Sequence, residues 1–305
     1  MVPARRMAAG SCHPVPPDAC PMKRHFLHPS GLHIAIEGPG PFATRLSFTR
    51  AGQRIVWLAR QHRKGLDLRH RALDPAGRPF WQSAAYNRSV GAIFAVGAFL
   101  FMLGSVLSLV PASAWAWPAL WTNMVFFAGS IPFTIAGYLQ HFQAANASEF
   151  MVDPPAGQER RVALIGWHPT SAGWLSTFTQ FLGTVAFNFN TFDAILAPPA
   201  ATAQDLFIWT PDMIGSALFL ISGYLAFIET SHRYWSWKPK DLAWQIVFVN
   251  LLGCIAFMIA AILAFVPAGP EPSWIPAVSN INLLLGALGF FIGALLTMRE
   301  SRAAS

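Results

Sequence analysis

The chain has 305 residues, of which 54% are hydrophobic and only 11% are charged. Soluble domains carry about 25% charged residues, so this composition predicts an integral membrane protein and disfavours a soluble enzyme. The 21 Lys and Arg residues outnumber the 14 Asp and Glu residues. In a membrane protein such an excess indicates orientation rather than nucleic-acid binding, and no nucleic-acid partner is expected.

The first part of the chain is predicted to lie outside the membrane. Residues 1–41 contain eight prolines and little hydrophobic periodicity, which predicts a disordered leader. Residues 42–88 form a basic juxtamembrane segment. Within it, residues 45–59 alternate in hydrophobicity on either side of an Ala-Gly turn, which predicts a small β-hairpin.

The stretch ARQHRKGLDLRHR, residues 59–71, concentrates cations shortly before the first apolar run. Such clusters bind anionic lipid headgroups. The alternative is that the cluster is only the basic flank that sets orientation. The candidate lipid contacts are Arg60, Arg63, Lys64, Arg69 and Arg71.

Six segments are long and apolar enough to be membrane-spanning helices, which need about 20 residues each. They are residues 89–110, 120–140, 174–197, 211–229, 242–266 and 279–298. The predicted fold is therefore all-α and integral to the membrane. It comprises three hairpins, 89–140, 174–229 and 242–298, and a short tail, 299–305.

All 21 Lys and Arg residues fall on one side of this arrangement. They lie before the first span, between the second and third, between the fourth and fifth, or after the sixth. Because positively charged segments stay in the cytoplasm, both termini are predicted to be cytoplasmic in a bacterial inner membrane.

The third span contains the stretch FNFNTFD, residues 187–193, which is unusually polar for a membrane helix. At 100° per residue one helix face collects Thr177, Gln180, Thr184, Asn188 and Thr191. Such a face should be turned away from lipid. It either hydrogen-bonds neighbouring helices, at about 0.6 kcal/mol per bond, or lines a polar pathway.

Asp193 is the only acid inside a predicted span rather than at its end. It shares with Asn190 a helix face that differs from the threonine-rich one, near the outer end of the span. An intramembrane acid is a candidate functional residue. The residues expected at the same depth are Asn123, Asp212, Asn280 and Asn282. Together they predict a shallow, weakly acidic cluster at the outer face, for which helix capping is an alternative explanation at Asp212 and Asn280. No histidine lies within a span, and neither a metal nor another cofactor is expected.

The three hairpins resemble one another. GSIPFTIAGYL, residues 129–139, and GSALFLISGYL, residues 215–225, match at seven of eleven positions, and GALGFFIGALL, residues 286–296, keeps the first glycine, the phenylalanine and the last leucine. This pattern predicts three tandem hairpins packed about a pseudo-threefold axis. Gly129, Gly137, Gly215, Gly223 and Gly286 are the expected helix-packing positions.

This Gly-Ser-x-x-Phe…Gly hairpin, preceded by a basic segment, resembles the YrhK-like bacterial membrane proteins. The resemblance covers roughly residues 80–300 and implies a multi-pass protein of the inner membrane, but no catalytic residues.

The first prediction for function is a non-enzymatic membrane protein with a structural or accessory role. Its expected partners are lipids of the bilayer and either further copies of itself, in a homo-oligomer, or another membrane protein. The alternative is a small-solute or ion transporter with a path along the third span and a mouth at Asp193. A membrane enzyme ranks third.

Overall fold

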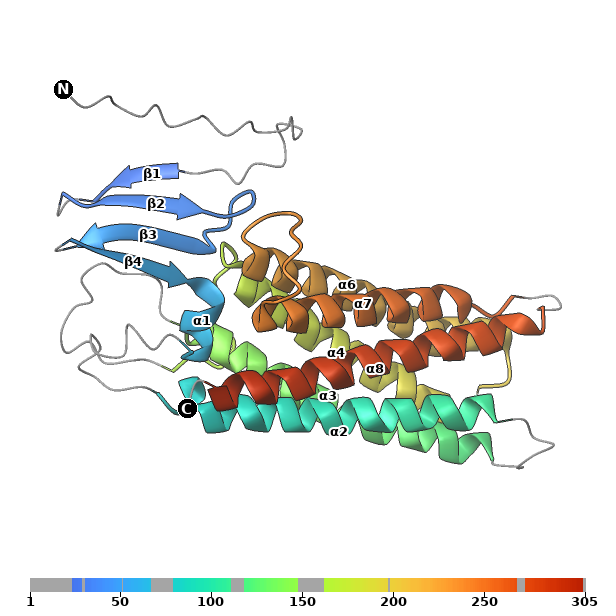
Figure 1. Cartoon of the computed structure of the whole chain (residues 1–305). Helices are drawn as coiled ribbons and strands as arrows, with labels where there is room; N and C mark the ends of the chain where they lie inside the picture. Colours follow the sequence, from blue (N-terminus) through green and yellow to red (C-terminus); the bar gives the residue numbers. More distant parts are fainter. Residues whose placement is uncertain are drawn as a thin grey trace, which may run out of the picture.

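The computed structural model describes residues 24–28, 31–50, 52–66, 79–110, 118–147, 162–196, 198–267 and 272–303. Within these ranges the chain forms a four-stranded sheet, which is followed by a bundle of six long helices (Figure 1). The sheet lies at one end of the bundle. We call that end the sheet end, and we call the opposite end, where α3 and α8 begin, the far end.

The sheet is an antiparallel meander in chain order, β1–β2–β3–β4. Its strands are β1 (Arg24–Leu27), β2 (His33–Glu37), β3 (Arg45–Arg50) and β4 (Gln53–Leu58). Alternate residues of β2 and β3 point to one face, so Ile34, Leu46 and Phe48 form a small buried cluster.

The predicted hairpin is confirmed, because β3 pairs with β4 from Arg45 opposite Leu58 to Arg50 opposite Gln53. Two other predictions need correction. The leader was expected to be disordered to residue 41, but β1 and β2 lie inside it, because β2 completes its backbone hydrogen bonds against β3. For the same reason the fold is not all-α. Residues 1–23 of the leader lie outside the described ranges.

The helices follow the sheet. They are α1 (Ala59–Lys64), the 3₁₀ turn η3 (Phe80–Gln82), α2 (Ala84–Leu109), α3 (Ala119–Ala145), α4 (Ala172–Leu196), α5 (Ala201–Gln204), the π-helical turn η4 (Asp205–Trp209), α6 (Thr210–Ser231), α7 (Leu242–Leu263) and α8 (Trp274–Ala303). The long helices form a closed ring. Each packs against the next in chain order, and α8 returns to pack against α2.

Five helical segments of the described chain are long and apolar enough to cross a membrane: α2, α3, the continuous stretch from α5 to α6, α7 and α8. They mark the chain as a multi-pass membrane protein. The helix that falls short is α4, which has 25 residues but carries the polar FNFNTFD stretch.

The same close glycine contact recurs in three pairs of helices. A Cβ added to Gly97, Gly183 or Gly253 would lie 3.0, 3.1 or 2.9 Å from the carbonyl oxygen of Gly129, Gly215 or Gly286 respectively. These distances leave no room for a side chain, so the helices touch backbone to backbone. Gly223 faces Cys254 Sγ just as closely, at 2.9 Å, but Gly137 has ordinary contacts of 3.4 Å or more.

The centre of the bundle is filled by one phenylalanine from each long helix. We call this set the phenylalanine layer; it consists of Phe101, Phe133, Phe187, Phe219, Phe257 and Phe290, all buried. Within each helix pair the rings lie 5.1 to 5.5 Å apart. Rings from different pairs also meet, as Phe133 and Phe290 do at 5.7 Å. The layer therefore joins all six helices around one axis.

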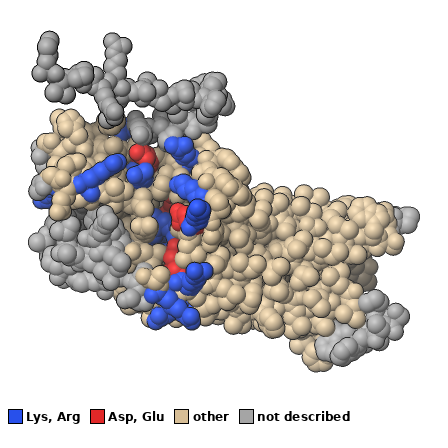
Figure 2. All heavy atoms as spheres, in the orientation of Figure 1, with Lys and Arg blue, Asp and Glu red and all other residues tan. Residues whose placement is uncertain are grey.

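Charge is distributed unevenly along the molecule. On the face shown in Figure 2, the Lys, Arg, Asp and Glu side chains gather where the sheet meets the bundle, and the rest of the bundle surface is uncharged. Large apolar side chains are exposed on the outside of the helices, among them Phe99, Ile135, Ile221 and Ile292. This surface is suited to contact with lipid.

Candidate functional site

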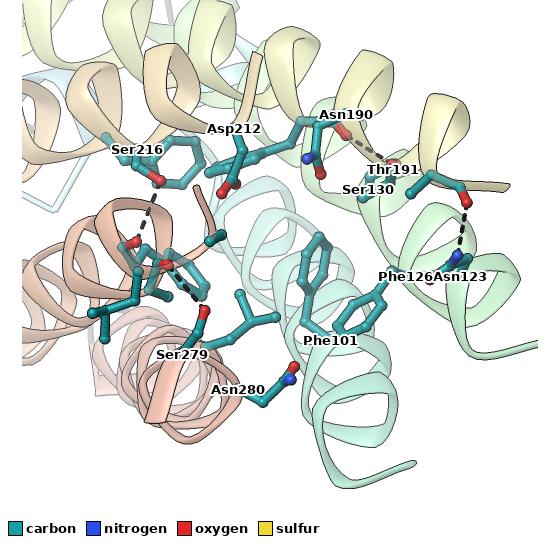
Figure 3. A pocket seen from close by; sticks show the side chains of 18 of the residues that line it. Phe101, Asn123, Phe126, Ser130, Asn190, Thr191, Asp212, Ser216, Ser279 and Asn280 are labelled. Atoms are coloured by element: carbon teal, nitrogen blue, oxygen red, sulfur yellow. Dashed lines mark hydrogen bonds between the residues drawn. The ribbon is translucent and has the colours of Figure 1, made fainter. Parts of the chain in front are cut away.

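The far end of the bundle encloses a cavity of about 300 Å³ on the side of the phenylalanine layer remote from the sheet. We call it the far cavity. Every long helix contributes to its wall (Figure 3). Five rings of the phenylalanine layer form its floor, and Asn123, Asn190, Asp212, Ser279 and Asn280 are among the polar residues nearer its mouth.

Asp212, in the first turn of α6, is the one charged residue among the described residues that line the far cavity. Its carboxylate points into the space between the helices (Figure 3). No Lys, Arg or His is present in the lining as far as the structure describes it. Asp212 therefore has no cationic partner within the cavity wall.

The asparagines of the wall turn their amide nitrogens toward backbone carbonyls. Asn123 Nδ2 donates to Ala194 O at 2.7 Å, and Asn190 Nδ2 donates to Ile208 O at 2.9 Å. Asn280 Nδ2 donates to Pro276 O at 3.0 Å. Each amide nitrogen uses one of its two protons in this way, and each amide oxygen is left as a hydrogen-bond acceptor.

The hydroxyl groups of the wall behave in the same way. Ser279 Oγ donates to Ala260 O at 2.9 Å, and Ser216 Oγ donates to Phe257 O at 3.4 Å. Ser130 and Thr191 also donate to carbonyls of their own helices. Because each hydroxyl has a single proton, what remains on these side chains is acceptor capacity.

A smaller cavity of about 80 Å³ lies on the sheet side of the phenylalanine layer. We call it the near cavity. Phe219 lines both cavities, so the layer forms the partition between them. The wall of the near cavity includes Gln180, Ser222 and Asn250. Asn250 Oδ1 is buried and has no hydrogen-bond partner.

The short helix α1 closes the near cavity at the sheet end. Its cations Arg60, Arg63 and Lys64 are buried and line this cavity. Arg60 forms a bidentate pair with Glu300 at the end of α8, with distances of 2.5 and 2.9 Å. Lys64 Nζ lies 3.1 Å from the same carboxylate, and Arg63 pairs with Glu229 of α6 at 2.6 Å.

The surroundings of Arg60 and Lys64 shift the pKa values of these two side chains in opposite directions. Burial opposes the charge of Arg60, but the Glu300 carboxylate outweighs it, and the pKa of Arg60 is raised. Burial and the neighbouring Arg60 lower the pKa of Lys64 to about 8. The charge on Lys64 is therefore held in place mainly by Glu300.

The proposed lipid contacts need correction. Arg60, Arg63 and Lys64 have exposed fractions of only 6%, 8% and 4%, and they bind carboxylates of the protein. A buried cation paired in this way is not available to a headgroup. Arg69 and Arg71 lie outside the described residues.

The sequence analysis did not identify Glu229 and Glu300 as the acids that hold α1. The similarity of the three hairpins could have identified them. Glu229 and Glu300 lie equally far along the chain from Gly215 and Gly286, and Gln143 lies equally far from Gly129. Gln143 Nε2 donates to Asn87 Oδ1 at 3.1 Å, and Asn87 Nδ2 donates to Lys64 O at 2.8 Å. All three positions thus hold α1 at the sheet end, two directly and one through Asn87.

The polar stripe of α4 packs mainly against α3. Asn188 Nδ2 donates to Thr134 Oγ1 at 2.8 Å, and Thr191 Oγ1 lies 3.2 Å from Ser130 Oγ. Thr184 is fully buried against Gly137. These contacts fit the interpretation that the stripe specifies helix packing. Gln180 and Thr191 also reach the near and the far cavity respectively, but Asn188 lines neither.

The predicted cluster near the far end is present in part. Asn123, Asn190 and Asn280 line one cavity as expected, together with Asp212. Asp193 is not among the described residues that line it. Asn282 also lies outside the lining and donates to Val278 O within its own helix. The acid of this site is therefore Asp212 rather than Asp193.

Comparison with known proteins found no matching family model, no matching curated protein and no matching solved structure.

Proposed function

We propose that this protein is a small-solute transporter of the bacterial inner membrane that binds its solute in the far cavity. The observation that carries this proposal is the arrangement of the far and near cavities on one bundle axis, separated by a single layer of side chains. Ligand sites between the helices of a bundle commonly have this form, and 300 Å³ is at the lower end of their usual size.

The proposal includes α4 as a sixth membrane span. Its exposed side is apolar, with Leu182, Phe189, Phe192 and Leu196 between 39% and 66% exposed. Its threonines at 177, 184 and 191 are buried against other helices. A helix with an apolar outside and a polar inside satisfies its polar groups without exposing them to lipid.

The orientation follows from the distribution of basic residues. Each Lys and Arg in the sequence lies toward the sheet end in the proposed six-span topology, and the hairpin turns at the far end have none. We therefore place the sheet and both termini in the cytoplasm and the far cavity on the opposite side. A solute enters the far cavity from outside the cell.

The path proposed here runs along the bundle axis rather than along the α4 stripe. From the far cavity a solute meets the phenylalanine layer, then the near cavity, and finally α1 with its ion pairs. Passage requires movement of the rings and of α1. The closed ring of helices therefore represents an outward-facing state of the transporter.

The three hairpins are proposed to be tandem repeats about a pseudo-threefold axis. The three equivalent glycine contacts and the six central phenylalanines support this. The resemblance to YrhK-like proteins stays a prediction, and it agrees with a hairpin as the repeating unit.

A second candidate is the structural or accessory role. The backbone contacts at the glycine pairs favour it, because such close packing serves stability alone as well as it serves transport. In that case lipid acyl chains fill the far cavity, and no soluble solute competes for it.

A cavity-filling variant separates these candidates. Ala194 lines the far cavity near its mouth, and Leu196, two residues later on α4, is 66% exposed on the outside. We compare Ala194→Phe with the control Leu196→Phe in lipid nanodiscs. Native mass spectrometry after incubation with anionic, neutral and cationic solutes measures which of them the full chain retains.

The wild-type protein and Leu196→Phe are expected to retain one solute in a one-to-one complex, and Ala194→Phe is expected to lose it. The same solute should then be taken up by proteoliposomes. Retention that is equal in both variants, or the absence of any retained solute, would contradict transport through the far cavity.

A further inference from the structure

We infer that the far cavity selects a small organic ammonium ion with an apolar or aromatic body. This inference rests on the proposed function, because it concerns the solute of the same cavity. Three features of the cavity support an ammonium ligand: the carboxylate of Asp212, the acceptor oxygens of the wall and the aromatic floor.

The carboxylate of Asp212 needs a positive partner that the protein does not provide. The hairpin turns at this end contain no Lys or Arg in the sequence, and the cavity lining contains no basic side chain. No ion pair involves Asp212 among the described residues. Burying a lone carboxylate in a partly enclosed apolar site is costly, and a bound cation offsets that cost.

The polar wall favours a ligand that donates hydrogen bonds. The amide nitrogens of Asn123, Asn190 and Asn280 face backbone carbonyls, and the hydroxyl protons of Ser216 and Ser279 are donated to the backbone as well. Each asparagine amide keeps one further N–H, but the amide, hydroxyl and carboxylate oxygens that remain as acceptors outnumber these donors. They match an ammonium group, which has donors only. An anionic solute would meet acceptors and a carboxylate, so it should be excluded.

The floor favours an apolar body beside the charge. Phe101, Phe133, Phe187, Phe219 and Phe257 present ring surfaces to the cavity. A cation over such a face gains roughly 3- to 30-fold in affinity through the ring quadrupole. An inorganic divalent ion fits less well, because the described residues contain no group of three His, Cys, Asp or Glu that could hold a metal.

The test uses three solutes of similar size and different charge: benzylammonium, benzyl alcohol and benzoate. Isothermal titration calorimetry at pH 7 measures their binding to the full chain in lipid nanodiscs. A hydrogen bond to a charged group contributes more binding free energy than a hydrogen bond between neutral groups. The affinity for benzylammonium should therefore be higher than that for benzyl alcohol by a factor of about ten or more. Benzoate should not bind.

Two variants locate the effect. Asp212→Asn is expected to lower the affinity for benzylammonium by about tenfold or more and to leave that for benzyl alcohol nearly unchanged. Asp193→Asn, the control on the same end of the bundle but outside the cavity lining, should change neither. The comparison of the three solutes on the wild-type protein does not depend on either variant folding.

The outcomes distinguish this inference from the proposed function. If benzyl alcohol or benzoate binds as tightly as benzylammonium, or if none of the three binds, selection of an ammonium ion is wrong. If a neutral or anionic solute is nevertheless retained in the mass spectrometric experiment and lost in Ala194→Phe, transport through the far cavity stands. If no solute of any charge is retained, both fail.

Discussion

The two ends of the bundle use charge in opposite ways. At the sheet end three buried cations of α1 meet Glu229 and Glu300, and the partners are paired at 2.5 to 3.1 Å. At the far end Asp212 borders a cavity of about 300 Å³ with no cation in its wall. The same six helices therefore end in a closure of paired charges on one side and an open cavity with an unpaired acid on the other.

The difference gives the two ends of the bundle distinct chemical characters. The phenylalanine layer and the glycine contacts are similar in all three helix pairs. The sheet end differs from the far end because α1 precedes the first long helix and packs there. It also differs because Gln143, Glu229 and Glu300, each 14 residues after a glycine of its helix, hold α1 in place. Three tests examine the contrast between the ends, and two examine the helix packing that the ends share.

Removing an acid should change the free energy of unfolding differently at the two ends of the bundle. Glu300→Gln leaves Arg60 and Lys64 buried without their carboxylate, and we expect a loss of about 3–5 kcal/mol in the free energy of unfolding. Asp212→Asn removes an unpaired carboxylate and should be neutral or stabilising. Denaturant unfolding in detergent measures both, and an equal loss in the two variants would refute the contrast.

Acidification should weaken the sheet end. His232 ends α6 with its Nδ1 3.0 Å from Thr44 Oγ1, and burial, Lys238 and Arg45 lower its pKa to about 4. Because the unfolded chain binds the proton first, stability is full above pH 6.5 and falls by up to about 3 kcal/mol as the pH drops toward 4.

The control for this pH effect is His232→Asn. Position 232 has a φ of 60°, a left-handed conformation that asparagine tolerates. Thermal unfolding between pH 7 and pH 4.5 should show a smaller decrease in this variant. An unchanged pH profile would mean that other groups cause the loss.

The shared framework should be sensitive where glycines touch. Gly183→Ala places a Cβ 3.1 Å from Gly215 O and 2.6 Å from Phe219, so it should cost about 1–3 kcal/mol. Gly137→Ala is the control, because its closest contacts are 3.4 Å or more, and alanine favours the helix by roughly 1 kcal/mol. Equal stability of the two variants would argue against backbone contact at Gly183.

The smallest effect is expected at the α3–α4 interface. Asn188→Ala removes the hydrogen bond to Thr134 and should cost about 0.6 kcal/mol. It should leave solute binding unchanged, because Asn188 does not line the far cavity. Loss of binding with little loss of stability would move the solute path to the α4 stripe.

The sequence alone predicts much of this structure. Apolar segments of about 20 residues locate the long helices, and the glycine and phenylalanine shared by residues 129–139 and 215–225 lie where the helices meet at their centre. The hairpin at residues 45–59 also follows from alternation. These features depend on local patterns that tolerate small errors in register.

Other features depend on contacts between distant parts of the chain. Arg60 and Glu300 are 240 residues apart, and nothing local distinguishes a buried basic helix from a lipid-binding one. The choice between Asp193 and Asp212 depends on helix rotation, which hydropathy does not specify. Strands β1 and β2 were missed because their partner is β3, and the nearby prolines favoured a disordered leader.

The most direct test of the central claim is the access of a reagent to the two cavities. Ser279 and Thr297 both lie on α8, and they line the far and the near cavity respectively. In a chain with Cys12→Ser, Cys20→Ser and Cys254→Ala, we would introduce Ser279→Cys or Thr297→Cys. Their rates of reaction with a membrane-impermeant cationic methanethiosulfonate would be measured on intact cells.

The account predicts rapid modification at position 279, slowed by benzylammonium, and little modification at position 297. Equal rates at the two positions, or faster reaction at 297, would contradict a bundle that is open at the far end and closed at the sheet end by α1.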